Sequence, residues 1–421
     1  MYFDSFFFCT ISCYCITVTN YLCVLRSLHM ILYLIVDPQY KESLWCNEIL
    51  CGIREQATAY KYTVKQLHPD SVSNAISDDR YNGQENNRIL LLIGTSVSWI
   101  QQTIHELSLT FESSLGNVIH PSKTYLPSLT ISPDASGAVS LISTLSFDYK
   151  RAMHQILTYL NNTGNTRIAF VGVNKSSTAD LIKKSCFPQE DAIYYNNGSI
   201  LHAVESFWAD VRKYDAVICA NDVVALFLSA YLKKRGIIIP RDLHLVSFGN
   251  FYLSQLSAPT ISSIELNNVI LGREAVRAAS YLAKSPSVAV DIRIPCVLHL
   301  RQSSGIAGEE AFIKQDGILA RSSAIDNNTN FYEDSNVSAL MSLENTLLNA
   351  DITDLQILRG LLQRDPLDKI AEETHYSLST VKYRIRKMCE RYGTSDKNIL
   401  LNSLQAYVSP EKLLTAEERV L

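Results

Sequence analysis

A segment near the C-terminus, residues 378–391, combines a helical apolar stripe with a concentration of positive charge. Val381, Ile385 and Met388 recur at i, i+4 and i+7, which is typical of the buried face of an α-helix. The basic side chains then occupy the other faces, and Glu390 is the one acid among them. Such a helix can place lysine and arginine on the phosphates and base edges of a DNA major groove, although an ordinary solvated basic helix has the same pattern. The basic residues are Lys382, Arg384, Arg386, Lys387 and Arg391.

A polar pair, Asn221 and Asp222, directly follows the strand-like apolar run Ala216–Cys219. Open α/β folds bind ligands beyond the carboxyl ends of their strands, so both side chains are candidate ligand contacts. An amide beside a carboxylate can hold hydroxyl groups through paired hydrogen bonds. Helix capping is the alternative, because Asn or Asp before the helical Val223–Tyr231 is a good N-cap. One of the two can cap the helix while its neighbour points into a cleft.

No catalytic or metal-binding signature accompanies these residues. The sequence has no Gly-x-Gly-x-x-Gly loop after a strand, no Walker-type phosphate loop and no Gly-x-Ser-x-Gly turn. The histidines of residues 30–305 are scattered singly along the chain. We therefore expect no enzymatic activity, no metal and no cofactor. The ten cysteines include no Cys-x-x-Cys pair, which favours a reducing, cytoplasmic compartment.

Helices with clear end signals surround the basic segment. Pro366 suits a first helical turn with Asp365 as its cap, and Gly393 ends the basic helix, which Ser377 or Ser379 can cap. Only a short turn separates the basic helix from the one before it, as a helix-turn-helix requires. The pattern predicts an all-α, four-helix domain. Its helices are expected at Asp351–Leu362, Pro366–Thr374, Leu378–Arg391 and Ser395–Tyr407.

Several stretches of this domain match a known pattern, which is most specific where Thr380-Val-Lys382 opens the third helix behind Lys369-Ile-Ala-Glu372. With Ile357–Gln363 and Arg391–Gly393, the segment resembles the LuxR/NarL-type helix-turn-helix. The turn at 363–368 departs from the Gly-Leu/Ser-Asn-Lys turn of that family, which weakens the case for phosphate contacts there. In the family the third helix is the recognition helix. The resemblance implies DNA contacts by Thr380, Lys382, Tyr383, Arg386 and Lys387.

Residues 30–305 alternate short apolar runs with amphipathic stretches, which is typical of a parallel sheet flanked by helices. The number of such units is enough for two lobes. Strands are expected at Ile31–Val36, Ile89–Ile93, Arg167–Val171, Ala216–Cys219 and Leu243–Phe248. Helices are expected at Leu44–Ala59, Ile100–Leu115, Met153–Leu160, Ser199–Val211 and Val223–Arg235.

Distinctive runs at 215–222, 232–248 and 298–305 resemble the effector-binding domain of the LacI/GalR repressor family. The resemblance implies a two-lobe, periplasmic-binding-protein-like α/β fold with a small polar effector, such as a sugar, in its cleft. It implies Asn221, Asp222 and Asn250 as effector contacts. Gly249 stands where many sugar-binding relatives have an aspartate, and Asp180 where several have an arginine. Members of that family carry their helix-turn-helix before the sensor, whereas this chain has its DNA reader behind it.

Three further segments lie outside the sensor (30–305) and the reader (351–408). Residues 1–29 form an apolar extension, and the charge-free run Phe6–Leu25 is long enough to cross a bilayer. A true start at Met30, the beginning of a strand-like run, accounts for this extension better than a membrane anchor. Residues 306–350 are expected to be a linker with one short helix near Val337–Leu348, and 409–421 a tail.

Together these patterns predict a cytoplasmic, homodimeric transcription regulator that binds double-stranded DNA and senses a small polar metabolite. Since the net charge of the chain is −4, contact with DNA must come from a local basic patch. Two alternatives remain open. One is a ligand-blind regulator whose sensor fold serves only to dimerise, and the other is a membrane-anchored solute-binding protein built on residues 6–25.

Overall fold

The computed structural model describes residues 30–41, 43–67, 88–103, 105, 128–131, 143–285, 288–306, 331 and 334–413. The apolar extension 1–29, most of the helix expected over Ile100–Leu115, the polar stretch 307–330 and residues 414–421 lie outside the described residues. Among the described residues, no helix is both long and apolar enough to span a membrane.

The first lobe is a parallel sheet in which β1 and most of β3 and β5 are buried. β1 is buried over its whole length and pairs in parallel with β2 on one side and β3 on the other. This explains its continuous apolar run, since a strand covered by helices on both faces has no polar side. The strand order is β11 (Asp291–Ile294), β5 (Ser143–Phe147), β4 (Ser128–Ile131), β3 (Arg88–Ile93), β1 (Ile31–Val36), β2 (Thr63–Gln66). The helices α2 (Leu44–Tyr60) and α10 (Asn268–Lys284) pack against each other in this lobe.

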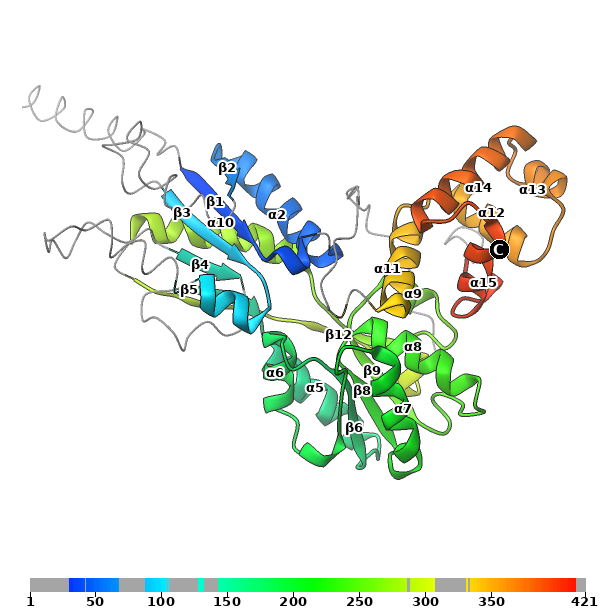
Figure 1. The fold of residues 1–421 in the computed structure, drawn as a ribbon, viewed down its shortest axis with the longest axis horizontal. Coiled ribbons are helices and arrows are strands. Elements are labelled where there is room, and N and C mark those ends of the chain that lie inside the picture. The colour runs from blue at the N-terminus through cyan, green and yellow to red at the C-terminus, as the bar shows by residue number, and fades with distance from the viewer. Residues whose placement is uncertain are drawn as a thin grey trace, which may run out of the picture.

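The second lobe repeats this arrangement, with one antiparallel strand, β12, at its edge. The strand order is β12 (Val297–His299), β10 (Ser262–Glu265), β9 (His244–Gly249), β8 (Ala216–Cys219), β6 (Ile168–Val173), β7 (Ile193–Tyr195). Its helices are α5 (Tyr149–Asn162), α6 (Thr178–Ser185), α7 (Ile200–Asp210), α8 (Asp222–Lys233) and α9 (Tyr252–Leu256). The expected two-lobe α/β architecture is confirmed, and Figure 1 shows the lobes as separate sheets.

The chain crosses between the lobes at three short connections within the described residues. They are Asp148 between β5 and α5, 266–267 between β10 and α10, and 295–296 between β11 and β12. Each crossing leaves one sheet and enters the other lobe directly. Because only a few residues form each crossing, the lobes can change their separation by small backbone rotations there.

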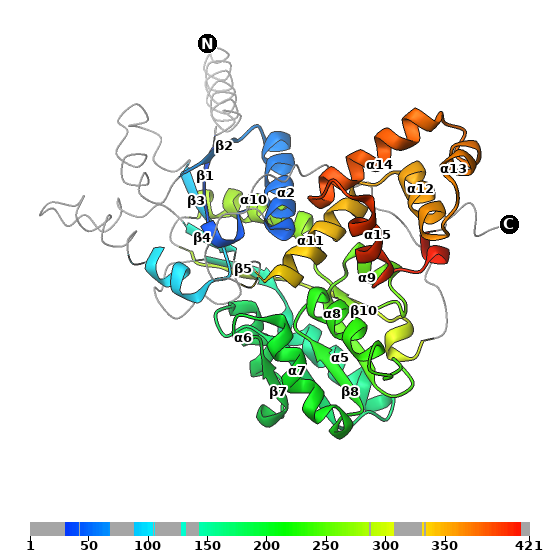
Figure 2. The same ribbon diagram turned by 45° about the vertical axis from the view of Figure 1, so that its right-hand side comes forward.

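A helical unit follows the sensor and lies against its second lobe (Figures 1 and 2). Four of its helices begin and end within two residues of the expected bounds. Ser377 caps the third of them as expected, whereas Pro366 rather than Asp365 occupies the cap position of the second. The four are α12 (Ile352–Leu362), α13 (Leu367–Glu373), α14 (Leu378–Tyr392) and α15 (Lys397–Gln405), and a short helix, η9 (Pro410–Leu413), follows them.

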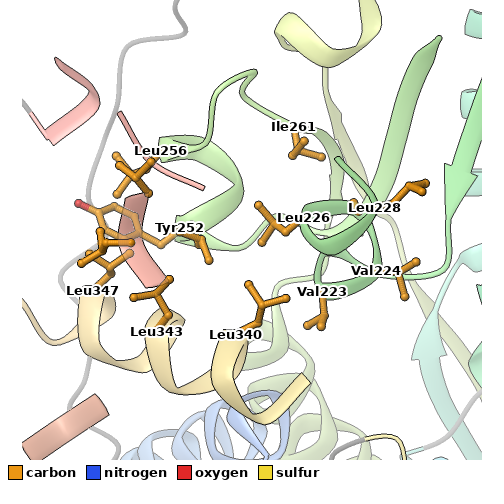
Figure 3. Packing of buried hydrophobic residues seen from close by; sticks show 14 of the residues in the cluster. Val223, Val224, Leu226, Leu228, Tyr252, Leu256, Ile261, Leu340, Leu343 and Leu347 are labelled. Carbon is orange, nitrogen blue, oxygen red and sulfur yellow. The ribbon is translucent and has the colours of Figure 1, made fainter. Parts of the chain in front are cut away.

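The short helix expected near Val337–Leu348 is present as α11 (Ser335–Leu348), but it packs against the rest of the protein instead of lying in a linker. Leu340, Leu343 and Leu347 are buried and point toward α8 and α9 of the second lobe (Figure 3). The same helix also contacts α14 and α15 of the helical unit. The polar composition of 306–350 as a whole concealed this, because the apolar residues that matter recur at helical spacing within only fourteen positions. Residues 335–348 are therefore part of the folded core rather than of a linker.

Candidate effector cavity and DNA-binding face

A cavity of about 690 Å³ lies between the two lobes. Several of its polar groups come from loops that follow strands of the second sheet, the position at which open α/β folds bind ligands. Its volume is within the range of roughly 300–1,000 Å³ usual for small-molecule sites. The polar lining includes Asn174, Lys183, Asn221, Asn250, Gln255 and Arg301. The apolar lining includes Leu44, Trp45, Phe248, Met341 and Leu348.

The two lobes touch at one edge of the cavity through backbone hydrogen bonds. The N–H of Thr178 donates to the carbonyl of Thr95 over 2.9 Å, and the N–H of Val97 donates to the carbonyl of Ser176 over 3.2 Å. Both bonds join the loop after β3 to the start of α6. Since they cross from one lobe to the other, any opening of the cleft at this edge must break them.

Asp222 lies beneath the cavity and does not line it. One carboxylate oxygen accepts hydrogen bonds from the hydroxyls of Ser247 (2.5 Å) and Ser263 (2.7 Å), and the other accepts from the N–H of Phe251 (2.6 Å). Burial raises the pKa of Asp222, while these three donors lower it. The carboxylate ties β8, β9 and β10 together, so the expectation that Asp222 contacts the effector is corrected to a structural role.

Asn221 combines the two roles that its position allowed. Its side-chain oxygen accepts a hydrogen bond from the N–H of Val224 at 3.0 Å, which caps α8. The residue also lines the cavity. Because the cap uses the amide oxygen, the amide nitrogen is the group that Asn221 can offer to an effector.

Asn250 lines the cavity on a strained turn after β9. Its φ is 58°, a left-handed conformation that Asn tolerates better than most residues, and its side-chain oxygen accepts a hydrogen bond from Arg301 at 2.7 Å. The preceding Gly249 has a φ of 131°, and a Cβ there would lie 3.2 Å from the ring of Phe251. A side chain at 249 is therefore disfavoured by the backbone conformation of this turn.

The Asp180 and Lys183 side chains form a buried ion pair at the cavity wall. Lys183 Nζ lies 2.6 Å from Asp180 Oδ1 and donates a hydrogen bond of 2.6 Å to the carbonyl of Ala220. The ammonium also lies 4.8 Å from the ring centre of Phe248, within cation–π range. The pairing neutralises both charges at the cavity wall.

A second charged pair at the cavity joins Glu265 to His299. His299 Nε2 lies 2.8 Å from Glu265 Oε2, and this contact lowers the pKa of the glutamate. This contact is an ion pair only when His299 is protonated, and in either state it engages the Glu265 carboxylate at the cavity. Its polar chemistry suits a neutral ligand with many hydroxyl groups better than an anion or a cation.

Glu344 connects α11 to the loop that lines the cavity. Its two carboxylate oxygens accept hydrogen bonds of 2.7 Å from the N–H groups of Tyr252 and Leu253, the first residues of α9. The side chain is 2% exposed, and desolvation raises its pKa to about 8. Asn250 and Phe251, which precede α9, line the cavity. A shift of this loop therefore displaces the backbone N–H groups that Glu344 of α11 holds.

The outward face of α14 carries most of the expected DNA contacts. Lys382 is exposed and has no ion-pair partner within the part of the chain that the structure describes. Tyr383 is 50% exposed, with the Arg386 guanidinium 5.4 Å and the Lys387 ammonium 5.8 Å from its ring centre. Arg386 and Lys387 share Glu390 as an acidic neighbour, at 3.7 and 2.8 Å. The structure therefore brings four of the five expected residues onto one accessible surface.

Thr380, the fifth expected contact, is half-buried in the first turn of α14. Its backbone N–H donates to the hydroxyl of Ser377, and the two hydroxyls are 2.9 Å apart. It belongs to the cap of α14, so its hydroxyl is already engaged at the helix start.

Two basic residues of α14, Arg384 and Arg391, bond to groups of the protein outside α14. Arg384 donates hydrogen bonds to Asp351 (2.8 Å) and Asp354 (2.9 Å), and these carboxylates raise its pKa. Arg391 donates to the carbonyl of Asn349 at 3.0 Å and lies 3.6 Å from Asp354. Of the five basic side chains expected on the polar faces, Lys382, Arg386 and Lys387 therefore form the outward face, whereas Arg384 and Arg391 are held by other parts of the protein.

Three cavity residues, Lys183, Arg301 and Glu344, were not singled out from the sequence. A signal existed for Glu344, because it is the one charged residue within the otherwise uncharged helix Ser335–Leu348. Lys183 follows Asp180 at helical spacing, which is the spacing of an ion pair. No group of histidine, cysteine, aspartate and glutamate suited to a metal ion occurs among the described residues.

The α/β part of the chain is similar to known proteins. Residues 157–304 match the family model of a periplasmic binding protein-like domain. The chain is 24% identical over 277 residues to catabolite control protein A of Priestia megaterium, an alignment that covers 62% of this chain and 78% of that protein.

Two solved structures share the fold. The transcriptional regulator CelR in complex with cellobiose superposes with a TM-score of 0.51 at 15% identity, covering 65% of this chain and 84% of CelR. The lac repressor dimer bound to operator and the anti-inducer ONPF superposes with a TM-score of 0.50 at 16% identity, covering 68% of this chain and 98% of the repressor. The α/β part is therefore a periplasmic-binding-protein-like domain similar to LacI/GalR-type sensors.

Proposed function

We propose that this protein is a transcription regulator that senses a sugar or similar polar metabolite between its two lobes and binds double-stranded DNA through α14. The observation that carries the proposal is the outward basic face of α14, held by a helical unit that packs on a sensor with an inter-lobe cavity. The C-terminal unit acts as a LuxR/NarL-type helix-turn-helix in which α14 is the recognition helix.

The geometry of α14 supports DNA binding. The apolar side chains Val381, Ile385 and Met388 anchor α14 to the helical core and leave its basic face outward. Lys382, Arg386 and Lys387 against Glu390 give this face an excess of positive charge. That charge can displace counterions from phosphates, while Tyr383 supplies an aromatic surface beside them.

The chemistry of the cavity supports a neutral polyhydroxy effector. Its amide groups come from Asn174, Asn221, Asn250 and Gln255, whereas its charged groups are largely paired within the protein. Amides both donate and accept hydrogen bonds, as hydroxyl groups do. CelR binds cellobiose in the same fold, which favours a sugar among neutral polar metabolites.

The contacts of α9 supply a route from the effector to the DNA reader. Glu344 of α11 holds the start of α9, and at its other end the N–H of Ala258 donates to the carbonyl of Tyr407 at 3.1 Å, next to a bridge between Ser257 and Val408. The helical unit therefore contacts both ends of α9, the helix that follows the cavity-lining residues Asn250 and Phe251. An effector can shift the reader only if it binds one lobe separation more tightly than another.

A homodimer is part of the proposal. One helix-turn-helix covers a short stretch of DNA, and readers of this size usually bind two half-sites as a dimer. The lac repressor, which shares the sensor fold, is a dimer on its operator. In a dimer, a change in lobe separation alters the spacing of the two α14 helices.

Capture of genomic DNA at physiological salt, followed by sequencing, tests DNA binding. The full chain is compared with a Lys382→Ala/Arg386→Ala variant. A Lys150→Ala/Arg151→Ala variant removes the same charge from exposed positions on α5 and serves as the matched control. We expect discrete sites to be enriched by the chain and by the control and to be lost with the α14 variant. Equal enrichment by all three proteins, or none by any, contradicts DNA recognition by α14.

A further inference from the structure

Two neighbouring stripes of α11 face different parts of the protein. Leu340, Leu343 and Leu347 pack against the second lobe (Figure 3), as described above. Met341, Glu344 and Leu348, each one position later, line the inter-lobe cavity. The spacing i, i+3, i+7 places these three on one helix face. A helix of the C-terminal unit therefore forms part of the wall of the effector cavity.

This wall offers a mainly apolar surface. Both oxygens of Glu344 accept from the backbone of α9, so its carboxylate is already used. Met341 is half-buried, and Leu348 keeps 36% of its surface exposed although it lies at the cavity. A polar ligand group placed against Met341 and Leu348 would lose hydrogen bonds to water without gaining any from these two side chains.

The first lobe adds apolar surface to the same cavity. Leu44 and Trp45, in the first turn of α2, are both half-buried and line it. Glu48, one turn further along α2, lines the same cavity as Glu344. The first turns of α2 and this face of α11 therefore belong to the wall of one cavity, and their apolar side chains add apolar surface to a cavity that also has amide groups.

We propose that Met341 and Leu348, with Leu44 and Trp45, form a subsite for an apolar group of the effector. The chemical class that fits both regions is a glycoside with an aryl or alkyl aglycone. Its sugar would contact the amides and Arg301, and its aglycone would contact α11. This inference rests on the proposed sensing of a sugar and adds which part of the sugar derivative α11 recognises.

Isothermal titration of the full chain tests the subsite with defined probes. The probes are glucose, galactose and cellobiose, together with the 4-nitrophenyl α- and β-glycosides of each. We expect at least one nitrophenyl glycoside to bind about tenfold more tightly than its parent sugar, because burying an aryl ring removes apolar surface from water. The Met341→Ala/Leu348→Ala variant should lose this gain, so that a nitrophenyl glycoside and its parent sugar bind the variant with similar affinity.

Leu201→Ala is the matched control. Leu201 is 37% exposed, as Leu348 is at 36%, but it belongs to α7 and does not line the cavity. This variant should keep the whole aryl gain. If the double variant fails to fold, the single Leu348→Ala change at the exposed position replaces it and should lose part of the gain.

The possible results distinguish failure of the subsite proposal from failure of the proposed sugar sensing. Parent sugars that bind without any aryl gain, or a gain that survives in the α11 variants, overturn the subsite and leave sugar sensing intact. No binding by any parent sugar or glycoside overturns sugar sensing and the subsite with it.

Discussion

Charged side chains in the wall of the inter-lobe cavity are buried and bonded within the protein, whereas those on the outward face of α14 are exposed. In the cavity wall Asp180, Lys183 and Arg301 are each less than a tenth exposed, and all are hydrogen-bonded or ion-paired within the protein. On α14, Lys382 and Arg386 project into solvent. A cavity wall whose charged side chains are bonded within the protein favours a neutral ligand. A face with excess positive charge favours a polyanion. The two regions therefore differ in the class of partner that they can attract.

The same contrast occurs within α14 itself. Arg384 and Lys382 are two positions apart, yet Arg384 is held by Asp351 and Asp354 and Lys382 is exposed. Helical geometry turns residues two apart to different sides, so one faces α12 and the other faces solvent. Charge alone does not identify a DNA contact, because the partner of each base decides what it can do.

The largest effect on stability is expected for Asp222→Ala. The change leaves the hydroxyls of Ser247 and Ser263 and the N–H of Phe251 without their buried acceptor, which should lower the free energy of unfolding by about 3–5 kcal/mol. Urea unfolding measures the loss. Asn221→Ala, which removes one helix cap, should cost only about 1 kcal/mol. A cost for Asp222→Ala no larger than this would return Asp222 to the set of effector contacts.

A pH-dependent loss of stability is expected from Glu344. Its pKa is raised from 4.5 to about 8, mainly by desolvation and further by Asp222 and Glu48. The folded state then retains a proton that the unfolded state releases, so this contribution is complete below about pH 4.5 and is lost as the pH rises through about 8. The free energy of unfolding should fall by about 1.4 kcal/mol per pH unit within this window. Glu344→Gln should flatten the dependence, and an unchanged slope in that variant would contradict the assignment.

A smaller stability effect separates the inward and outward bases of α14. Arg384→Ala leaves the nearly buried Asp354 with only the longer contact to Arg391, and should cost about 1–3 kcal/mol. Lys382→Ala should change stability by less than about 0.5 kcal/mol, because Lys382 is exposed. Thermal unfolding of both variants measures the difference. Equal effects would mean that the two bases do not divide between packing and DNA.

The smallest predicted effect concerns the salt dependence of DNA binding. Lys382→Ala should reduce the slope of log affinity against log salt by about 1, since one phosphate contact is lost. Lys387→Ala should reduce it less, because Glu390 at 2.8 Å already offsets part of the Lys387 charge. Fluorescence anisotropy across a salt series gives both slopes. The reverse order would place Lys387 rather than Lys382 at the phosphate backbone.

Local periodicity was enough to predict most of the fold. The strands around β1, β6, β8 and β9 and the helices α12 to α15 were expected from apolar spacing and end signals, and the structure has them close to those bounds. The resemblance to LacI/GalR sensors predicted two lobes and a cleft, which the two sheets and the cavity confirm. Such features depend on short-range patterns that a sequence displays directly.

The roles of individual polar residues were harder to predict because their partners are distant in sequence. Asp222 is held by Ser247 and Ser263, and Glu344 reaches α9 across about ninety positions. No local pattern indicates such pairs. Packing of α11 was missed for a related reason: its leucines are buried by helices from two different parts of the chain.

The central claim, that the cavity and α14 are coupled, is tested most directly by measuring the affinity for a captured genomic site with and without a saturating sugar that the sensor binds. The account predicts a change of at least fivefold in either direction, a coupling of about 1 kcal/mol or more. It also predicts that Glu344→Gln, which weakens the link between α11 and α9, reduces that change. Identical DNA affinity at zero and saturating sugar would contradict the coupling and leave a regulator whose sensor fold serves only assembly.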